Sequence, residues 1–132
     1  GSIRATQWRG GGISHGVTPR DYTFDINKKE RTLALKSALT HKAQDKELMV
    51  IDTIKLESLK TKEIKKIIES LELAGKVLFV TGEDNENLFM ATRNLGYAYY
   101  ITSDEINCLD LVNADALVCD EEAVKKIEEV LK

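Results

Sequence analysis

The sequence predicts an α/β fold, a three-layer α/β/α sandwich around a mostly parallel four-stranded sheet, preceded by an extended basic arm. Two observations lead to this fold class. Between residues 27 and 132, short apolar runs alternate with segments whose apolar residues recur at helical spacing. Residues 1–26, in contrast, contain a run of three glycines, the only proline and no sustained apolar periodicity. Regular alternation of strands and helices favours parallel strands joined by right-handed helical connections.

The globular region is predicted to open with a helix over residues 28–44. Its apolar residues recur at helical spacing, and Asn27 with Glu30 resembles a capping box. The apolar run over residues 48–51 is bounded by charge on both sides, which is typical of a strand covered on both faces. We therefore expect this strand to be central in the sheet.

The same alternation continues to the end of the chain and gives a Rossmann-like order of elements. Glycines are expected to end two of the helices, and Asn or Asp residues to cap others. The predicted elements are a helix from about Thr61 that Gly75 ends, a strand over 77–80, a helix capped by Asn85 that Gly96 ends, a strand over 98–101, a short helix over 107–113, a strand over 116–119 and a final helix capped by Asp120.

Charge is distributed unevenly along the chain. Residues 1–66 carry fourteen Lys or Arg against eight Asp or Glu, a net charge of +6. Residues 67–132 carry five against fourteen, a net of -9, so the total of -3 hides two opposite halves. This asymmetry favours a basic surface for a polyanion, joined to an acidic body that faces away from it.

The two cysteines, Cys108 and Cys119, are predicted to be small core residues. They lack CxxC spacing and an accompanying histidine cluster, so neither a zinc site nor a redox pair is expected. No apolar run approaches the roughly 20 residues that a membrane span requires. We expect a cytoplasmic protein with no membrane partner, no metal and no cofactor.

The loops that follow the predicted strands offer little to an enzyme. Ligands of open parallel sheets bind beyond the carboxyl ends of the strands. The loops there read Asp52–Lys55 and Thr81–Asp84, without GxGxxG or GxxxxGK[ST], and their acidic residues would repel a phosphate. His41 is expected to be a solvated helix residue. We predict that the chain is not an enzyme and has no small-molecule substrate.

The arm and the start of the first helix have the composition of an RNA-binding segment. Guanidinium groups contact phosphates and stack on bases, a Trp stacks on an unpaired base, and glycines let a backbone pass through narrow gaps. Lys29 and Lys36, seven residues apart, share one stripe of the helix. The predicted RNA-binding residues are Arg4, Gln7, Trp8, Arg9, Gly10, Gly11, Gly12, His15, Arg20, Lys28, Lys29, Arg31 and Lys36.

The order and spacing of several motifs resemble bacterial large ribosomal subunit protein four over essentially the whole chain. The resemblance is carried by Gly1–Ala5, Gln7–Gly12, Pro19–Tyr22, Lys28–Lys29, Leu33–Leu39, Lys60–Lys62, Glu86–Leu88, Ala91–Leu95 and Glu128–Leu131. It implies a globular α/β domain over 27–132 and, over 1–26, the returning limb of a long loop that enters ribosomal RNA towards the peptide exit tunnel. A strand, a helix and the outgoing limb, which precede this limb in family members, are not in the sequence.

The resemblance implies a structural constituent of the large ribosomal subunit that binds ribosomal RNA and neighbouring ribosomal proteins. Without the family's first strand, one edge of the sheet is expected to be open to pairing or aggregation. Some family members repress their own operon, so a regulator that binds a messenger leader with the same surface is an alternative. A small Rossmann-like enzyme or nucleotide-binding module is a third reading, which the loops disfavour.

Overall fold

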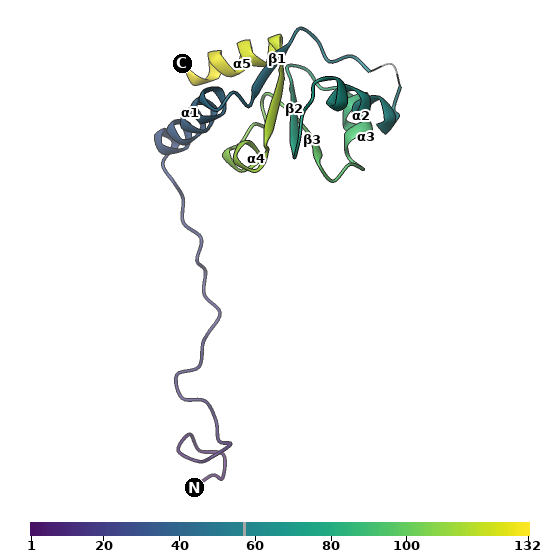
Figure 1. Ribbon diagram of the computed structural model, residues 1–132. Coiled ribbons are helices and arrows are strands. Elements are labelled where there is room, and N and C mark those ends of the chain that lie inside the picture. Colours follow the sequence, from purple (N-terminus) through teal and green to yellow (C-terminus); the bar gives the residue numbers. More distant parts are fainter. Residues whose placement is uncertain (57) are drawn as a thin grey trace.

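A computed structural model describes residues 1–56 and 58–132 of the chain. In these residues a long N-terminal segment leads into an α/β body, which Figure 1 shows at the far end of that segment. The elements are α1 (Lys28–Gln44), β1 (Leu48–Ile51), α2 (Thr61–Ser70), β2 (Val77–Thr81), α3 (Glu86–Thr92), β3 (Ala98–Thr102), α4 (Cys108–Asn113), β4 (Ala116–Asp120) and α5 (Glu121–Leu131). The predicted alternation of helices and strands is confirmed.

The four strands form a parallel sheet in the order β1-β4-β2-β3. β2 and β4 are the central strands, and their side chains are almost entirely buried. β1 pairs with β4 alone among the described strands, and Val50 in it remains 50% exposed. The prediction that residues 48–51 form a central strand was therefore wrong, because an apolar run of this length does not specify its place in the sheet.

Helices cover both faces of the sheet, so the predicted three-layer sandwich is confirmed. α2 and α3 pack on one face through Ile64, Ile68, Leu88 and Ala91, around the central Phe79. α1, α4 and α5 lie on the other face, and their apolar residues surround the alternate side chains of β2 and β4. Alternation along a parallel strand sends successive side chains to opposite layers, which is why both faces of β2 are apolar.

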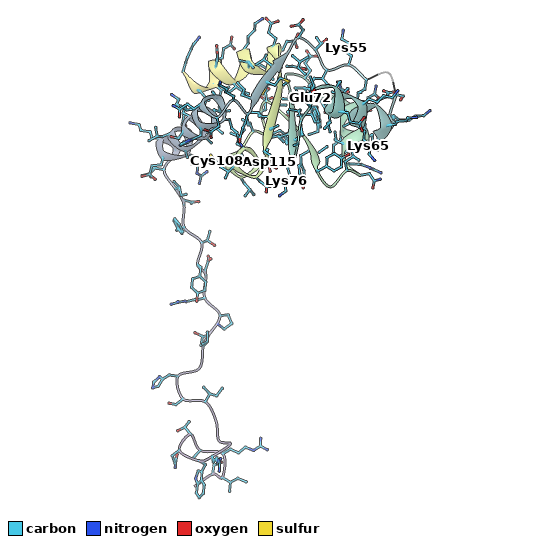
Figure 2. The ribbon with its side chains drawn as sticks, in the orientation of Figure 1. Lys55, Lys65, Glu72, Lys76, Cys108 and Asp115 are labelled. Carbon is cyan, nitrogen blue, oxygen red and sulfur yellow. The ribbon has the colours of Figure 1, made fainter. Side chains whose placement is uncertain are left out.

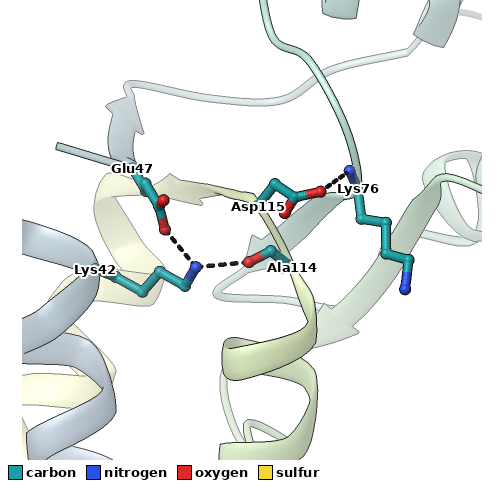
Figure 3. Close-up of polar contacts among 5 residues, drawn as sticks. All are labelled: Lys42, Glu47, Lys76, Ala114 and Asp115. Carbon is teal, nitrogen blue, oxygen red and sulfur yellow. Dashed lines mark hydrogen bonds and ion pairs between the residues drawn. The ribbon is translucent and has the colours of Figure 1, made fainter. Parts of the chain in front are cut away.

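α1 is attached to the body more loosely than the other long helices. None of its 17 described residues is buried, and three half-buried residues, Leu35, Ala38 and Leu39, provide its apolar contact. Lys42 adds a polar attachment, since its ammonium donates to the carbonyl of Ala114 at 2.6 Å and pairs with Glu47 (Figure 3). The C-terminal end of α1 is therefore fixed beside the sheet.

Side-chain capping follows the sequence prediction at Asn85, occurs without having been predicted at Asn107, and is absent at two predicted positions. The Asn85 side chain accepts from the Leu88 N–H at 3.1 Å, and Asn107 accepts from the Asp110 N–H at 2.9 Å. Asn27 and Asp120 occupy the predicted N-cap positions, but neither side chain makes a capping hydrogen bond, so the predictions hold for position and fail for the bond. A backbone-only N-cap leaves the first helical N–H groups to other acceptors.

The predicted glycine stops also need correction. α2 ends at Ser70, and Glu72, rather than a glycine, is the residue just beyond it with positive φ. Gly75 (φ +83°) instead allows the chain to pass Asp115, whose carboxylate accepts from the Lys76 N–H at 2.7 Å (Figure 3). α3 ends at Thr92, before the predicted stop at Gly96.

Candidate nucleic-acid interface

The first twelve residues fold back on themselves at the tip of the N-terminal segment. Successive turns are closed by the Trp8 N–H on the Ala5 carbonyl at 3.0 Å and the Gly11 N–H on the Trp8 carbonyl at 2.9 Å. The Gly12 N–H then reaches the Arg4 carbonyl at 2.9 Å, which joins the two ends of the loop. Residues 2–12, called the tip here, thus have local order that their composition did not predict.

Gly11 is the glycine of the tip at which an added Cβ would collide with backbone atoms. A Cβ at this position would lie 2.0 Å from the Ala5 carbonyl oxygen and 3.0 Å from that of Trp8. At Gly12 the nearest atom to such a Cβ is the Arg4 carbonyl oxygen at 3.5 Å, an ordinary contact. The glycine run therefore contains one position of close packing beside a tolerant one.

The tip brings seven of the predicted RNA-binding residues, Arg4, Gln7, Trp8, Arg9, Gly10, Gly11 and Gly12, into one short loop. Arg4, Gln7, Trp8 and Arg9 are all exposed, and Trp8 retains 60% of its surface. Figure 2 shows side chains projecting from the N-terminal segment without a layer of protein around them. Two guanidinium groups and an indole ring are thus available to a ligand at this end of the chain.

Arg20 lies farther along the segment, stacked on an aromatic ring that sequence reasoning missed. Its guanidinium carbon is 4.5 Å from the ring centroid of Tyr22. The spacing of two residues was the available signal, because side chains at i and i+2 of an extended backbone point to the same side. His15, also predicted, is exposed with φ 55°, and the structure does not bring it together with Arg20 or the tip.

The first turns of α1 form a second cationic site. Lys28, Lys29 and Lys36 line one shallow groove together with Thr32 and Leu33. The predicted shared stripe of Lys29 and Lys36 is therefore confirmed, and Lys28 joins it. This group is called the α1 groove below.

Arg31 belongs less clearly to this cationic site. Its guanidinium lies 3.7 Å from the Asp25 carboxylate, and both side chains are largely exposed. An exposed ion pair of this length contributes little stability, but it reduces the net charge that Arg31 offers to a phosphate.

Several basic residues of the body have structural partners instead. Lys42 is engaged by Glu47 and Ala114, and Lys76 donates to Asn113 at 2.8 Å. Lys126 donates to the carbonyl of Gly82. Counting charges along the sequence therefore overstates the cations that the body can offer to a polyanion.

The carboxyl ends of the strands, where ligands of parallel sheets bind, carry an acidic groove. Its acidic residues come from two loops, two helix starts and the end of β4, and Lys55 is the basic residue in its lining. The acids are Asp52, Glu83, Asp84, Glu86, Asp120 and Glu122. Burial raises the pKa of the Asp120 carboxyl, with a smaller contribution from the charge of Glu122. This groove is electrostatically unsuited to a phosphate.

Metal-ligating residues and membrane-spanning helices are the two remaining features to consider. In residues 1–56 and 58–132, no three His, Cys, Asp or Glu side chains gather as a metal site would require. Within the same residues, every helix falls short of the length and apolar character needed to cross a bilayer. The cationic sites of the tip, Arg20 and α1 have a definite chemistry, the attraction of a polyanion.

Comparison with known protein families identifies the family of this chain. The sequence profile described as the Ribosomal protein L4/L1 family matches residues 1–130, which include the tip, the segment around Arg20, α1 and nearly all of the body.

Proposed function

Because the chain belongs to the ribosomal protein L4/L1 family, and is therefore a structural protein of the ribosome, we propose that it binds large-subunit ribosomal RNA through residues 1–26 and the α1 groove. The role is architectural and involves no turnover. The body serves as a support on the subunit surface and contacts neighbouring ribosomal proteins. The N-terminal segment lies within the RNA and, as the family resemblance implies, contributes to the wall of the peptide exit tunnel.

One observation carries this proposal. Exposed cations gather on the tip, at Arg20 and on the first turns of α1, whereas the sheet's ligand-binding edge is acidic. Phosphate neutralisation by such cations supplies sequence-independent affinity. Trp8, exposed beside two arginines, adds stacking on an unpaired base, which is how proteins distinguish folded RNA from a regular duplex.

The test is equilibrium binding to large-subunit ribosomal RNA across a salt series, for the 132-residue chain and a version without residues 1–26. We expect a steep dependence on salt that becomes shallower in the shortened chain, by about 0.7 to 0.9 for each lost phosphate contact. Circular dichroism of both chains controls for folding. Equal, weak binding by the two chains would contradict a site on residues 1–26.

Substitutions of single arginines test which residues of the segment contact RNA. Arg9→Ala and Arg20→Ala should each weaken binding while leaving thermal unfolding unchanged, because both side chains are exposed and lie outside the core. Lower thermal stability in both variants, with RNA affinity unchanged, would assign them a structural role instead.

A messenger leader that imitates ribosomal RNA would use the same surface. Competition between the two RNAs for the chain separates the architectural role from autoregulation. If a leader transcript displaces ribosomal RNA at comparable concentration, regulation becomes part of the function.

A further inference from the structure

Resting on the proposed contact between Arg20 and RNA, we propose that Tyr22 is a further residue of the interface. Its ring holds the Arg20 guanidinium as one flat layer, against which an unpaired base of the RNA stacks. Tyr22 acts through Arg20 and is a positioning residue.

The geometry of the pair is that of a cation–π contact. The guanidinium carbon lies 4.5 Å from the ring centroid, within the roughly 6 Å over which the quadrupole of an aromatic ring attracts a cation. Tyr22 is nevertheless 70% exposed, so the pair is not held by a surrounding core. The exposed ring of Tyr22 is removed from water only when a ligand covers it.

The residues on either side restrict the backbone that presents the pair. Pro19 fixes its own φ immediately before Arg20. Asp21 accepts from the Thr23 N–H at 2.8 Å and from the Thr23 hydroxyl, which closes an Asx turn through Tyr22. Residues 19–23 thus have a locally ordered backbone, although the segment that contains them forms neither helix nor strand.

The same turn leaves Arg20 electrostatically free. The nearest carboxylate in the sequence, Asp21, is occupied by two donors from Thr23. Among the described residues Arg20 forms no ion pair. Its positive charge is therefore not cancelled within the chain and is available to an anionic ligand, in contrast to Arg31, which faces Asp25.

A guanidinium stacked on a ring has three chemically different sides. One face is covered by Tyr22, the N–H edge can donate to phosphate oxygens, and the outer face is flat, weakly hydrated and suited to a nucleobase. Proteins recognise unpaired RNA bases by stacking on aromatic rings and on arginine planes. The pair of Arg20 and Tyr22 contains both an aromatic ring and an arginine plane. An unpaired nucleotide can place its base on the outer face of the guanidinium and its phosphate at the N–H edge.

The experiment compares four variants of the 132-residue chain with the parent, with large-subunit ribosomal RNA as the probe: Tyr22→Ala, Tyr22→Phe, Arg20→Ala and the double variant. Tyr22→Ala should weaken binding roughly two- to fivefold, the value of an exposed cation–π contact. Its salt slope should stay at that of the parent, because the charge of Arg20 is retained. Arg20→Ala should lower the slope by about 0.7 to 0.9 as one phosphate contact is lost.

Two results distinguish positioning from an independent contact. Tyr22→Phe should restore the parent affinity, since the ring rather than the hydroxyl carries the stack. The double variant should bind as Arg20→Ala does, because Tyr22 has no role once the guanidinium is gone. Unfolding curves of all variants should coincide, as neither residue belongs to the core.

Each contrary outcome has a definite meaning. Parent-like binding by Tyr22→Ala, a Tyr22→Phe variant as weak as Tyr22→Ala, or additive losses in the double variant would overturn the role of Tyr22. An unchanged Arg20→Ala variant, with binding still lost on removal of residues 1–26, would overturn this inference and leave the proposed function standing. If removal of residues 1–26 also had no effect, the proposed function would fail with it.

Discussion

The N-terminal segment and the body contain similar apolar residues and use them in opposite ways. In the body, Phe79 and Ile64 are completely buried between helices and sheet. In the segment, Phe24 is 81% and Val17 97% exposed. The difference teaches that the spacing of apolar residues, rather than their presence, decides which part of this chain forms a core.

The energetic reason lies in chain entropy. Ordering a backbone costs about 1–2 kcal/mol per residue, which only the burial of apolar surface offsets. The body meets this cost through two packed faces of one sheet. The N-terminal segment has local turns and no such layer, so we expect a ligand to complete its order.

The largest expected effect is on the stability of the body. Phe79→Ala should lower the free energy of unfolding by about 3–5 kcal/mol, since it removes a ring from the centre of the core. Urea unfolding followed by circular dichroism measures this. Should that variant not fold, Ile64→Val provides a milder change of about 0.5–1.5 kcal/mol.

The matched control lies in the N-terminal segment. Phe24→Ala removes the same side chain from an exposed position and should change the free energy of unfolding by no more than about 0.5 kcal/mol. Similar losses in Phe79→Ala and Phe24→Ala would mean that the segment packs on the body, and the contrast between the two regions would disappear.

A second prediction concerns how well the folded body shields the Cys119 thiol from a reagent. Burial, helped by the charge of Asp120, raises the pKa of the Cys119 thiol from 9.0 to about 12, which lowers its thiolate fraction by about a thousandfold. We expect alkylation of the folded chain to occur at Cys108 well before Cys119. Mass spectrometry of timed samples locates the label, and equal labelling in urea is the control.

Cys108 is half-buried at the start of α4. The prediction that both cysteines are core residues therefore holds for Cys119 and was wrong for Cys108. Equal labelling rates for Cys108 and Cys119 in the folded chain would show that the reagent reaches Cys119 in β4 as readily as it reaches Cys108.

The third prediction concerns the local order of the tip. Gly11→Ala should weaken binding to large-subunit ribosomal RNA by about tenfold, because the added Cβ would collide with the Ala5 carbonyl oxygen and force the tip out of this conformation. Gly12→Ala, one residue away with an ordinary 3.5 Å contact, should bind more nearly as the parent does. Indistinguishable affinities for the two variants would mean that the tip adopts another conformation on RNA.

The smallest effect is a local dependence on pH at Asp21. Hydrogen bonds from Thr23 lower the pKa of the Asp21 carboxyl below its ordinary value of 3.8. The turn is therefore fully formed above pH 3.8 and is lost as pH falls through the lowered pKa. In an NMR titration the Asp21 midpoint should rise in Thr23→Val, which lacks the hydroxyl donor, and an unmoved midpoint would argue against that bond.

Local patterns predicted the elements of the body well and their arrangement less well. The runs at Val77–Thr81 and Ala116–Asp120 were recognised because uninterrupted apolar residues suit strands covered on both faces. Leu48–Ile51 has the same composition and lies at the edge, since strand order depends on long-range packing. The caps at Asn27 and Asp120 failed for a related reason, because a cap requires a side-chain conformation that the surroundings determine.

The candidate site shows the same division between composition and geometry. Exposed cations on residues 1–36 could be predicted from residue types alone, and their RNA-binding roles stay predictions until they are measured. The close approach of Gly11 to Ala5 and the pairing of Arg31 with Asp25 depend on turns that no short motif announces. The stack of Arg20 on Tyr22 was within reach of the sequence, because their spacing places both on one side of an extended chain.

The segment between the tip and α1 also determines how two weak attachments would cooperate. Residues 13–27 join the tip to the α1 groove, and fifteen extended residues span at most about 50 Å. Once either end is bound, the other is confined within that radius, so its effective concentration no longer depends on how much protein is in solution. Inserting residues into this tether outside 19–23 would change the overall affinity while the contacts of the tip, of Arg20 with Tyr22 and of the α1 groove stay the same.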